Sequence, residues 1–284
     1  MYEAFYGLRE KPFSILPDPS YLYMSEAHKR ALMLLKYSLV SGQGFTVLSG
    51  AIGAGKTTLV NKLIEGLNED ISAGVLSFTQ QGSGTILEWV AMTYGLEYKG
   101  KTEAQLYEAF LEFLIQEYAA GRKVVLIVDE AQNMGIAGLE KLRMLSNVNA
   151  KKEYLLHMIL VGQPELRSLI KTPQLKQLLQ RVAVSFHLEA MNDKETRQYI
   201  KHRLELAGGD LSIFSQQALR LLIAASDGVP RVVNALCDLA LVYGFSAERN
   251  PVDVRIARSV LEDRWKMGLG TQRSPSSTGE KIGA

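Results

Sequence analysis

Short apolar runs alternate with longer amphipathic stretches over much of the chain. Each run has the length and composition of a strand that is buried on both faces. The strands predicted from these runs are Gly44–Ser49, Gly74–Thr79, Lys123–Val128, Leu156–Val161 and Val182–Leu188. Because helix-length segments separate them, we predict a mostly parallel sheet with helices packed on its faces.

The intervening segments carry the spacing of amphipathic helices. From about Ser25 to Ser41, apolar residues recur with a helical period. Thr102 and Gln105 have the reciprocal capping spacing of a helix start, and Gly121 suits the helix end. The face between them is marked by Leu106, Phe110, Leu114 and Tyr118. We therefore predict a helix between the second and third strands.

The strands cease after about Met191, and only helical patterns follow. The helices predicted there are Asp193–Ala207, Ser215–Ser226, Arg231–Ser246 and Pro251–Trp265. From Gly268 onward the sequence is rich in Gly and Ser, which is typical of a flexible tail. The chain is thus expected to contain an α/β domain and a smaller all-helical one.

Composition narrows the class of protein. Lys and Arg exceed Asp and Glu by a net charge of only +2, so bulk charge does not indicate a nucleic-acid partner. Cys237 is the single cysteine, which excludes a disulfide framework. No apolar stretch is long enough to span a bilayer, and the N-terminus lacks the apolar core of a signal peptide. We expect a cytoplasmic protein, with any contact to the inner membrane made through a partner.

One loop carries a strong chemical signature. Gly50-Ala51-Ile52-Gly53-Ala54-Gly55-Lys56-Thr57 follows an apolar strand and precedes a helical pattern that starts with Thr58. Glycines let such a loop aim several N–H groups at a polyphosphate, and the helix adds the positive end of its dipole. Lys56 is expected to contact the β- and γ-phosphates, and the Thr57 hydroxyl to ligate Mg²⁺.

An acidic pair follows the third strand. Asp129 and Glu130 come directly after an apolar run, at the strand end where open α/β sheets place ligand-binding groups. Asp129 is predicted to hold Mg²⁺ together with Thr57, and Glu130 to polarise the water that attacks the γ-phosphate. The alternative is that both residues only cap the helix beginning near Ala131. ATP is preferred over GTP because the chain lacks the guanine-reading pattern Asn/Thr-Lys-x-Asp.

Taken together, these motifs resemble the AAA+ ATPases, and more narrowly the ExeA/GspA type of secretion ATPase. The AAA+ likeness rests on the phosphate loop, Asp129-Glu130-Ala-Gln132 and Gly228-Val-Pro-Arg231. The narrower likeness rests on Phe5-Tyr-Gly-Leu8, Pro12-Phe13, Pro17-Asp-Pro19, His28, Val161-Gly-Gln-Pro-Glu-Leu166, Gln180-Arg181, Glu195-Thr196, Tyr199-Ile200 and His202-Arg203-Leu204. It covers about residues 1–266.

The resemblance implies an α/β P-loop NTPase fold of the AAA+ type, with a central five-stranded parallel sheet followed by a small all-helical lid domain. It also suggests four segments. Residues 1–43 form an N-terminal segment and first helix on the adenine side, and residues 44–190 form the nucleotide-binding domain. Residues 191–267 form the lid, and residues 268–284 form the tail.

The resemblance implies roles for four further residues. Gln163 resembles the polar sensor on the strand between the acidic and phosphate-loop strands, and Arg181 resembles an arginine finger that enters a neighbouring subunit's site. Arg231 resembles the second sensor of the lid, and Tyr23 resembles part of the segment that lines the base. Three of these have simpler alternatives: a strand-to-turn cap for Gln163, a solvated helix terminus for Arg181, and an ion pair with Asp227 for Arg231.

An arginine supplied by a neighbour means that one subunit cannot complete its own site, so the resemblance predicts a ring or filament with ATP at its interfaces. The first hypothesis is an ATPase that drives or regulates assembly of an envelope machine of the type II secretion or pilus type. The second is a DNA-binding regulator of transposition, similar to TniB, TnsC and MuB, with a transposase as partner. Lys141, Arg143, Lys151 and Lys152 would then line a DNA channel. The third is a scaffold that binds ATP but hydrolyses it poorly.

Overall fold

The computed structural model describes the chain except for residues 16–20, 43, 78–83, 151–152 and 269–284. The predicted tail, the Pro17-Asp-Pro19 motif and the Lys151-Lys152 pair fall outside or largely outside the described residues. The chain forms two units. One consists of Met1–Ser25, Gly53–Gly55 and the segment from Glu189 onward, and the other of Glu26–Ile52 and Lys56–Leu188.

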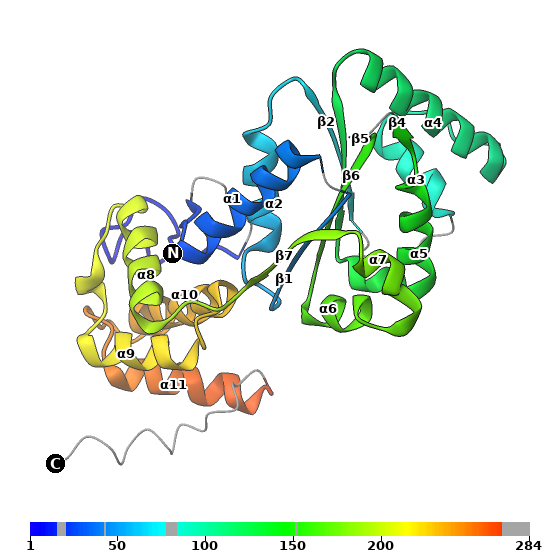
Figure 1. The fold of residues 1–284 in the computed structure, drawn as a ribbon. Coiled ribbons are helices and arrows are strands. Elements are labelled where there is room, and N and C mark those ends of the chain that lie inside the picture. The colour runs from blue at the N-terminus through cyan, green and yellow to red at the C-terminus, as the bar shows by residue number, and fades with distance from the viewer. Residues whose placement is uncertain (16–20, 43, 78–83, 151–152, 269–284) are drawn as a thin grey trace. The chain divides into compact units, whose positions relative to one another are not determined.

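The second unit is an α/β unit built on a five-stranded sheet (Figure 1). Its strands are β1 (Phe45–Gly50), β2 (Ile71–Ser77), β3 (Lys123–Asp129), β6 (Leu156–Gly162) and β7 (Val182–Leu188), with a two-stranded ribbon of β4 (Asn149–Ala150) and β5 (Glu153–Tyr154). The strand order is β2-β3-β6-β1-β7, and every pair in this sheet is parallel. The predicted parallel sheet is therefore confirmed, with β6 between β3 and β1.

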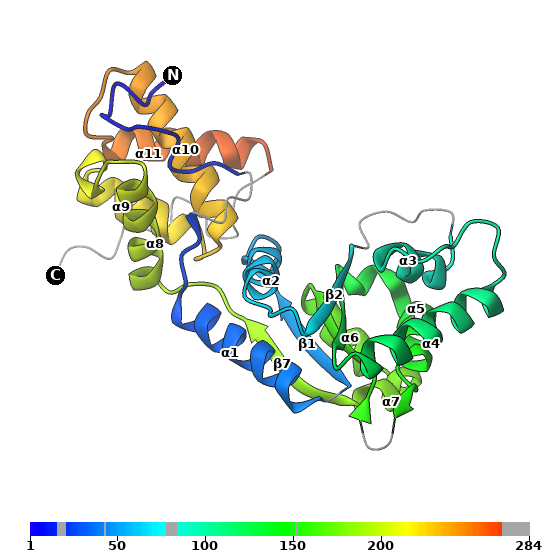
Figure 2. The ribbon, with the colours of Figure 1, turned by 90° about the horizontal axis from the view of Figure 1, so that it is seen from above.

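Helices cover both faces of this sheet, with α1 and α2 on one side and α3, α4 and α5 on the other (Figure 2). The helices of the unit are α1 (Glu26–Ser41), α2 (Lys56–Glu65), α3 (Ile86–Thr93), α4 (Glu103–Ala119), α5 (Gly135–Leu145), α6 (Pro164–Ile170) and α7 (Lys176–Leu179), with short 3₁₀ helices η2 (Ala131–Met134) and η3 (Pro173–Leu175). Alternate residues of the strands enter one apolar core on the α3–α5 side. From β3 and β6 these are Val124, Leu126, Val128, Leu156, Met158 and Leu160.

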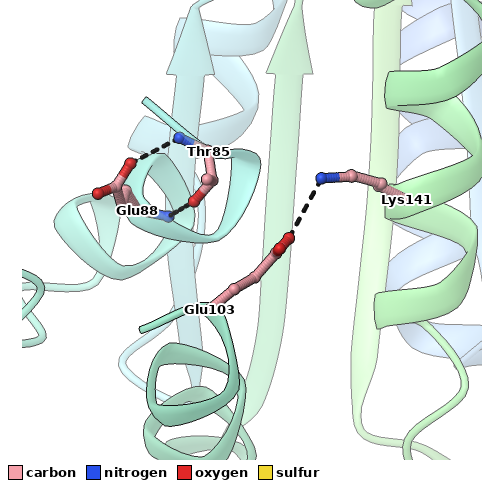
Figure 3. A network of polar contacts seen from close by, with 4 residues as sticks. All are labelled: Thr85, Glu88, Glu103 and Lys141. Carbon is pink, nitrogen blue, oxygen red and sulfur yellow. Dashed lines mark hydrogen bonds and ion pairs between the residues drawn. The ribbon is translucent and has the colours of Figure 1, made fainter. Parts of the chain in front are cut away.

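Two capping boxes start the helices that follow β2. The predicted one, at Thr102 and Gln105, is confirmed. At α3, which we did not predict, Thr85 and Glu88 exchange backbone and side-chain hydrogen bonds of 2.6 and 3.3 Å (Figure 3). In the same view, Lys141 on α5 donates to the Glu103 carboxylate at the start of α4, over 3.2 Å. The capping boxes define where α3 and α4 start, and the ion pair joins α4 to α5.

The edge strand β2 begins earlier than predicted, at Ile71 rather than Gly74. Its first residues are only partly buried, because an edge strand has a neighbouring strand on one side alone. They are therefore not all apolar, and a search for apolar runs does not detect them. The predicted end at Thr79 lies outside the described residues.

The first unit is helical. It contains α8 (Asp193–Leu206), the 3₁₀ helix η4 (Leu211–Ile213), α9 (Gln216–Ala225), α10 (Pro230–Ser246) and α11 (Val254–Lys266). All four helices predicted after Met191 are present, although α11 starts three residues later than Pro251. Among the described residues, no helix has the length and apolar character needed to cross a membrane.

The N-terminal segment packs into this helical unit. Tyr2, Tyr6, Leu8 and Phe13 belong to the same apolar core as α8–α11. Arg203 of α8 is only 6% exposed, and it donates from Nε to the carbonyl of Pro12 at 2.5 Å and from Nη1 to the Tyr199 hydroxyl at 2.9 Å. The turn-rich start of the chain is therefore a structural part of the helical unit.

Candidate nucleotide site

The predicted phosphate loop joins β1 to α2. Gly53 and Gly55 have φ angles of +77° and +94°, a region that residues with a β-carbon rarely adopt, so the loop depends on glycine at both positions. The helix starts at Lys56, and its free N–H groups lie at the positive end of the α2 dipole. The local backbone is thus that of an anion-binding turn.

Lys56 is a buried cation within this loop. Its residue is 5% exposed, and Nζ donates to the carbonyls of Gly50 at 2.8 Å and Ala51 at 3.0 Å. Burial lowers the pKa of Lys56, and the negative charges of Glu130, Asp129 and Glu165 offset only part of that effect. A phosphate group would supply the anionic partner that the two neutral carbonyls do not.

The loop and the acidic strand meet at Thr57. Its hydroxyl donates to Asp129 Oδ2 over 2.8 Å, and the other carboxylate oxygen of Asp129 accepts from the Glu130 N–H at 2.9 Å. Asp129 is only 6% exposed, so its carboxylate is fixed from both sides. The two residues predicted to hold Mg²⁺ therefore lie in direct contact.

Glu130 turns the chain sharply away from the sheet. Its backbone is left-handed, with φ of 54° and ψ of 38°, a conformation that costs a non-glycine residue on the order of 1–3 kcal/mol. Its carboxylate accepts from Gln132 Nε2 at 2.6 Å and from Gln163 Nε2 at 3.1 Å. Burial by itself would raise the pKa of Glu130, but these two hydrogen bonds and the charge of Lys56 outweigh it, so that pKa is lowered. Glu130 is thus held in its ionised form.

Gln163 follows the central strand β6 and precedes α6. Because β6 pairs with both β3 and β1, the carboxyl ends of the three strands lie side by side. This adjacency brings Gln163 to Glu130 across 33 positions of sequence. Gln132, to which we assigned no role from the sequence, completes the group by accepting the Gln163 N–H on Oε1 at 3.1 Å.

Arg181 lies just before β7, as expected for a residue at that edge of the α/β unit. Its Nη1 donates to Ser146 Oγ at 2.9 Å, and Ser146 in turn donates to the carbonyl of Arg143 at the end of α5. No motif in the sequence indicates Ser146 as its partner. The role of Arg181 at a neighbour's site remains a prediction.

The two remaining predicted residues belong to the helical unit. Arg231 is the second residue of α10, directly after Pro230. Tyr23 packs its ring against Tyr199 and His202 of α8, with centroids 6.0 and 5.7 Å away. Their roles toward a nucleotide remain predictions.

The residues of the α/β unit fit a magnesium–nucleotide complex. Thr57 and Asp129 offer a hydroxyl and a carboxylate, the hard oxygen ligands that Mg²⁺ prefers, and phosphates complete such sites. In the part of the chain that the structure describes, no group of three or more His, Cys, Asp or Glu residues forms an all-protein metal site. The donor set thus suits a cation that is shared with phosphates.

Comparisons with known proteins agree with this geometry. Residues 38–170 match the sequence model of a family described as "AAA domain". General secretion pathway protein A of Aeromonas hydrophila is 36% identical over 278 residues, which are 95% of this chain and 51% of that protein. The chain therefore spans about half the length of the curated relative that it matches.

Solved structures show the same fold at low sequence identity. The ORC2 protein of Aeropyrum pernix in its ADPNP–ADP complexes is 18% identical, with a TM-score of 0.64 over 96% of this chain and 75% of that one. A Walker-type ATPase of Pyrococcus abyssi is 15% identical, with a TM-score of 0.62 over 90% of this chain and 77% of that one. Residues 38–170 thus match an AAA domain within a chain that has the fold of the AAA-type P-loop NTPases, and over nearly its whole length the chain is similar to general secretion pathway protein A.

Proposed function

We propose that this chain binds ATP with Mg²⁺ and hydrolyses it to ADP and phosphate. The observation that carries the proposal is the contact of Thr57 with Asp129, next to an ionised Glu130. It joins the end of the phosphate loop to the acidic strand, which is the arrangement that phosphoryl transfer needs.

Each residue of the site has a part in this reaction. The loop N–H groups and Lys56 bind the phosphates, while Thr57 and Asp129 hold the cation, which supplies charge neutralisation on the transferring phosphate. Glu130 orients the attacking water, and Gln163 contacts the γ-phosphate or that water. We extend the nucleotide site to Thr58, and to Tyr23 and Arg231 of the helical unit, which acts as a lid.

The active form is proposed to be an oligomer in which Arg181 enters the site of a neighbour. An arginine supplied in this way typically contributes about 10³–10⁵ in rate by neutralising charge in the transition state. In this chain its guanidinium is held by Ser146, so it must leave or extend from that hydroxyl to act in trans. Turnover per subunit should therefore rise with protein concentration.

The process that we favour is the assembly or regulation of an envelope machine of the type II secretion or pilus type. The support is the similarity to general secretion pathway protein A across 95% of this chain. We expect the protein to act at the cytoplasmic side of the inner membrane through a protein partner.

Steady-state hydrolysis tests the activity directly. We expect phosphate release that requires Mg²⁺ and falls by at least about 10²-fold in Glu130→Gln, because the amide cannot polarise water as the carboxylate does. The variant should still bind ATP. The exposed Glu112→Gln on α4 is the matched control and should retain full turnover. Undiminished hydrolysis by Glu130→Gln would refute the catalytic assignment.

Binding to duplex DNA in the presence of ATP separates the two cellular processes. The envelope reading predicts no binding at physiological salt. Binding that weakens steeply as salt rises would instead favour the regulator of transposition, since phosphate contacts release counterions. Fluorescence anisotropy of a labelled duplex across a salt series provides the measurement.

A further inference from the structure

Glu130, Gln132 and Gln163 form a closed ring of hydrogen bonds, which includes the backbone N–H of Gln163. Gln132 donates from Nε2 to Glu130 Oε2 at 2.6 Å and accepts the backbone N–H of Gln163 on Oε1 at 3.1 Å. Gln163 closes the ring by donating from its own Nε2 to the same Glu130 oxygen at 3.1 Å. The ring links the end of β3 to the start of α6.

The orientation of the Gln132 amide is determined by its two partners. Reversing it would place a carbonyl oxygen against the Glu130 carboxylate and an NH₂ group against the Gln163 N–H. Both contacts would then be repulsive, and the partly buried N–H of Gln163 would lose its acceptor. Only a side chain with a donor and an acceptor at this spacing satisfies both neighbours.

The backbone is shaped to admit this side chain. The left-handed turn at Glu130 starts the 3₁₀ helix η2 and brings residue 132 back over the end of the sheet. Gly162, the last residue of β6, leaves the space that the amide occupies. A β-carbon there would lie 2.4 Å from Gln132 Oε1, well inside van der Waals contact.

We propose that Gln132 is a positioning residue, which holds the Glu130 carboxylate in place and couples it to Gln163. The inference rests on the proposed function, in which Glu130 orients the attacking water. Because two donors share one carboxylate oxygen, the Gln163 side chain can leave for a phosphate while Gln132 still restrains Glu130. Gln163 thereby senses the nucleotide without releasing Glu130.

The first test is Gln132→Met, which keeps the length of the side chain and removes both hydrogen bonds. We expect kcat for ATP hydrolysis to fall roughly tenfold to a hundredfold, since loss of orientation at a reacting group has effects of that size. The KM and the affinity for a non-hydrolysable ATP analogue should change by less than about twofold, because Gln132 is not proposed to touch nucleotide. Gln116→Met, at an exposed position of α4, is the matched control.

Gly162→Ala provides an independent route to the same defect. The added methyl would lie 2.4 Å from Gln132 Oε1 and 2.9 Å from Leu166 Cδ2, so it displaces the Gln132 amide and shifts the Leu166 side chain without altering the chemistry of any ring member. It should lower kcat to a similar degree, and combining it with Gln132→Ala should add little to the loss from Gln132→Ala alone. Fully additive losses would overturn the proposal, because they would mean that Gly162 acts elsewhere.

The NMR signal of the Gln132 side-chain amide tests the contact without any turnover. Because Gln132 Nε2 donates to the Glu130 carboxylate, Glu130→Ala should shift that signal, whereas the exposed Glu112→Gln should not. A protein that shows this shift but no hydrolysis would refute the proposed function alone. Active protein with an unchanged kcat in Gln132→Met would refute the positioning role alone.

Discussion

The hydroxyl of Thr57 donates to the carboxylate of Asp129 over 2.8 Å, although 72 positions of sequence separate the two residues. This contact places the last residue of the phosphate loop against the end of the strand that carries the acidic pair. A cation bound by both oxygens would lie next to Glu130, whose N–H also donates to Asp129. The contact is the geometric basis of the proposed magnesium site.

Thr57→Val should remove the magnesium-dependent part of nucleotide binding and leave the rest. The substitution keeps the volume of the side chain but deletes the oxygen that we expect to ligate the cation. Hydrolysis should fall by at least roughly tenfold to a hundredfold, because loss of even an outer-shell partner of a metal ligand has effects of that size. Titrations with ATP in Mg²⁺ and in EDTA give the measurement. Thr172→Val, which alters a hydroxyl bonded to the carbonyl of Leu169, should behave as wild type.

The affinity for ATP should fall at alkaline pH. The fall should begin at a pH below the ordinary pKa of a lysine side chain. Burial lowers the pKa of Lys56 in the free protein, and bound phosphates favour its charged form. Above the free-protein pKa, binding must therefore take up a proton, and affinity declines by about tenfold per pH unit. Lys56→Arg should abolish this decline, because guanidinium stays charged, whereas the exposed Lys62→Arg should preserve it. An unchanged decline in Lys56→Arg would contradict the assignment.

The same pKa has a consequence for stability. Since the folded-state pKa of Lys56 lies below the unfolded value, the free energy of unfolding of the nucleotide-free protein should increase as pH rises between the two. Denaturant titrations across that interval should show a smaller increase in Lys56→Met, which has no such group.

Much of the α/β unit follows from the sequence because its strands contain short apolar runs, although the partly buried start of β2 does not. The phosphate loop and the acidic pair can also be predicted from the sequence, since glycine, lysine and carboxylates occur there at the spacings of a nucleotide site. The role of Gln132 cannot be predicted in this way, because a glutamine after an acidic residue carries no chemical signature of its own. Its partners become visible only when β3 and β6 are neighbours and Gly162 leaves space. Ser146 escapes for the same reason, as its hydroxyl meets Arg181 only through the fold.

The N-terminal residues show a second limit of sequence reasoning. Residues 1–14 show no regular spacing of apolar positions, yet Tyr2 and Phe13 are each only 1% exposed. Aromatic residues of an irregular segment are buried in a core that helices elsewhere in the chain form. A local sequence period does not indicate such burial. Tertiary packing therefore decided what the pattern left open.

Two inactive variants should restore hydrolysis when mixed, if Arg181 acts in trans. Arg181→Ala keeps an intact Glu130, and Glu130→Gln keeps an intact Arg181, so a mixed oligomer contains some complete sites. We expect phosphate release from the mixture to exceed the sum of the separate variants. The matched control is Arg167→Ala at an exposed position of α6, which should hydrolyse ATP without a second variant. A mixture no more active than its components would argue that Arg181 serves only its own chain.

Arg203→Leu should destabilise the helical unit by about 2–4 kcal/mol. The change leaves the carbonyl of Pro12 without that charged donor and removes the guanidinium from the rings of Tyr21 and Tyr199, whose centroids lie 4.8 and 5.7 Å from it. Urea unfolding followed by circular dichroism gives the free energy. Arg220→Leu, at an exposed position of α9, should shift it by less than about 0.5 kcal/mol.

Both extremities of the described polypeptide contribute to one body, because Tyr2, Tyr6 and Phe13 share an apolar core with helices α8–α11. In sequence, the α/β unit of Glu26–Ile52 and Lys56–Leu188 is therefore inserted between two parts of the helical unit. Expression of the C-terminal helices by themselves would leave bare the surface that Tyr2, Tyr6 and Phe13 normally cover. A soluble fragment of that body would require the first 25 residues spliced back by a short linker or supplied as a separate peptide.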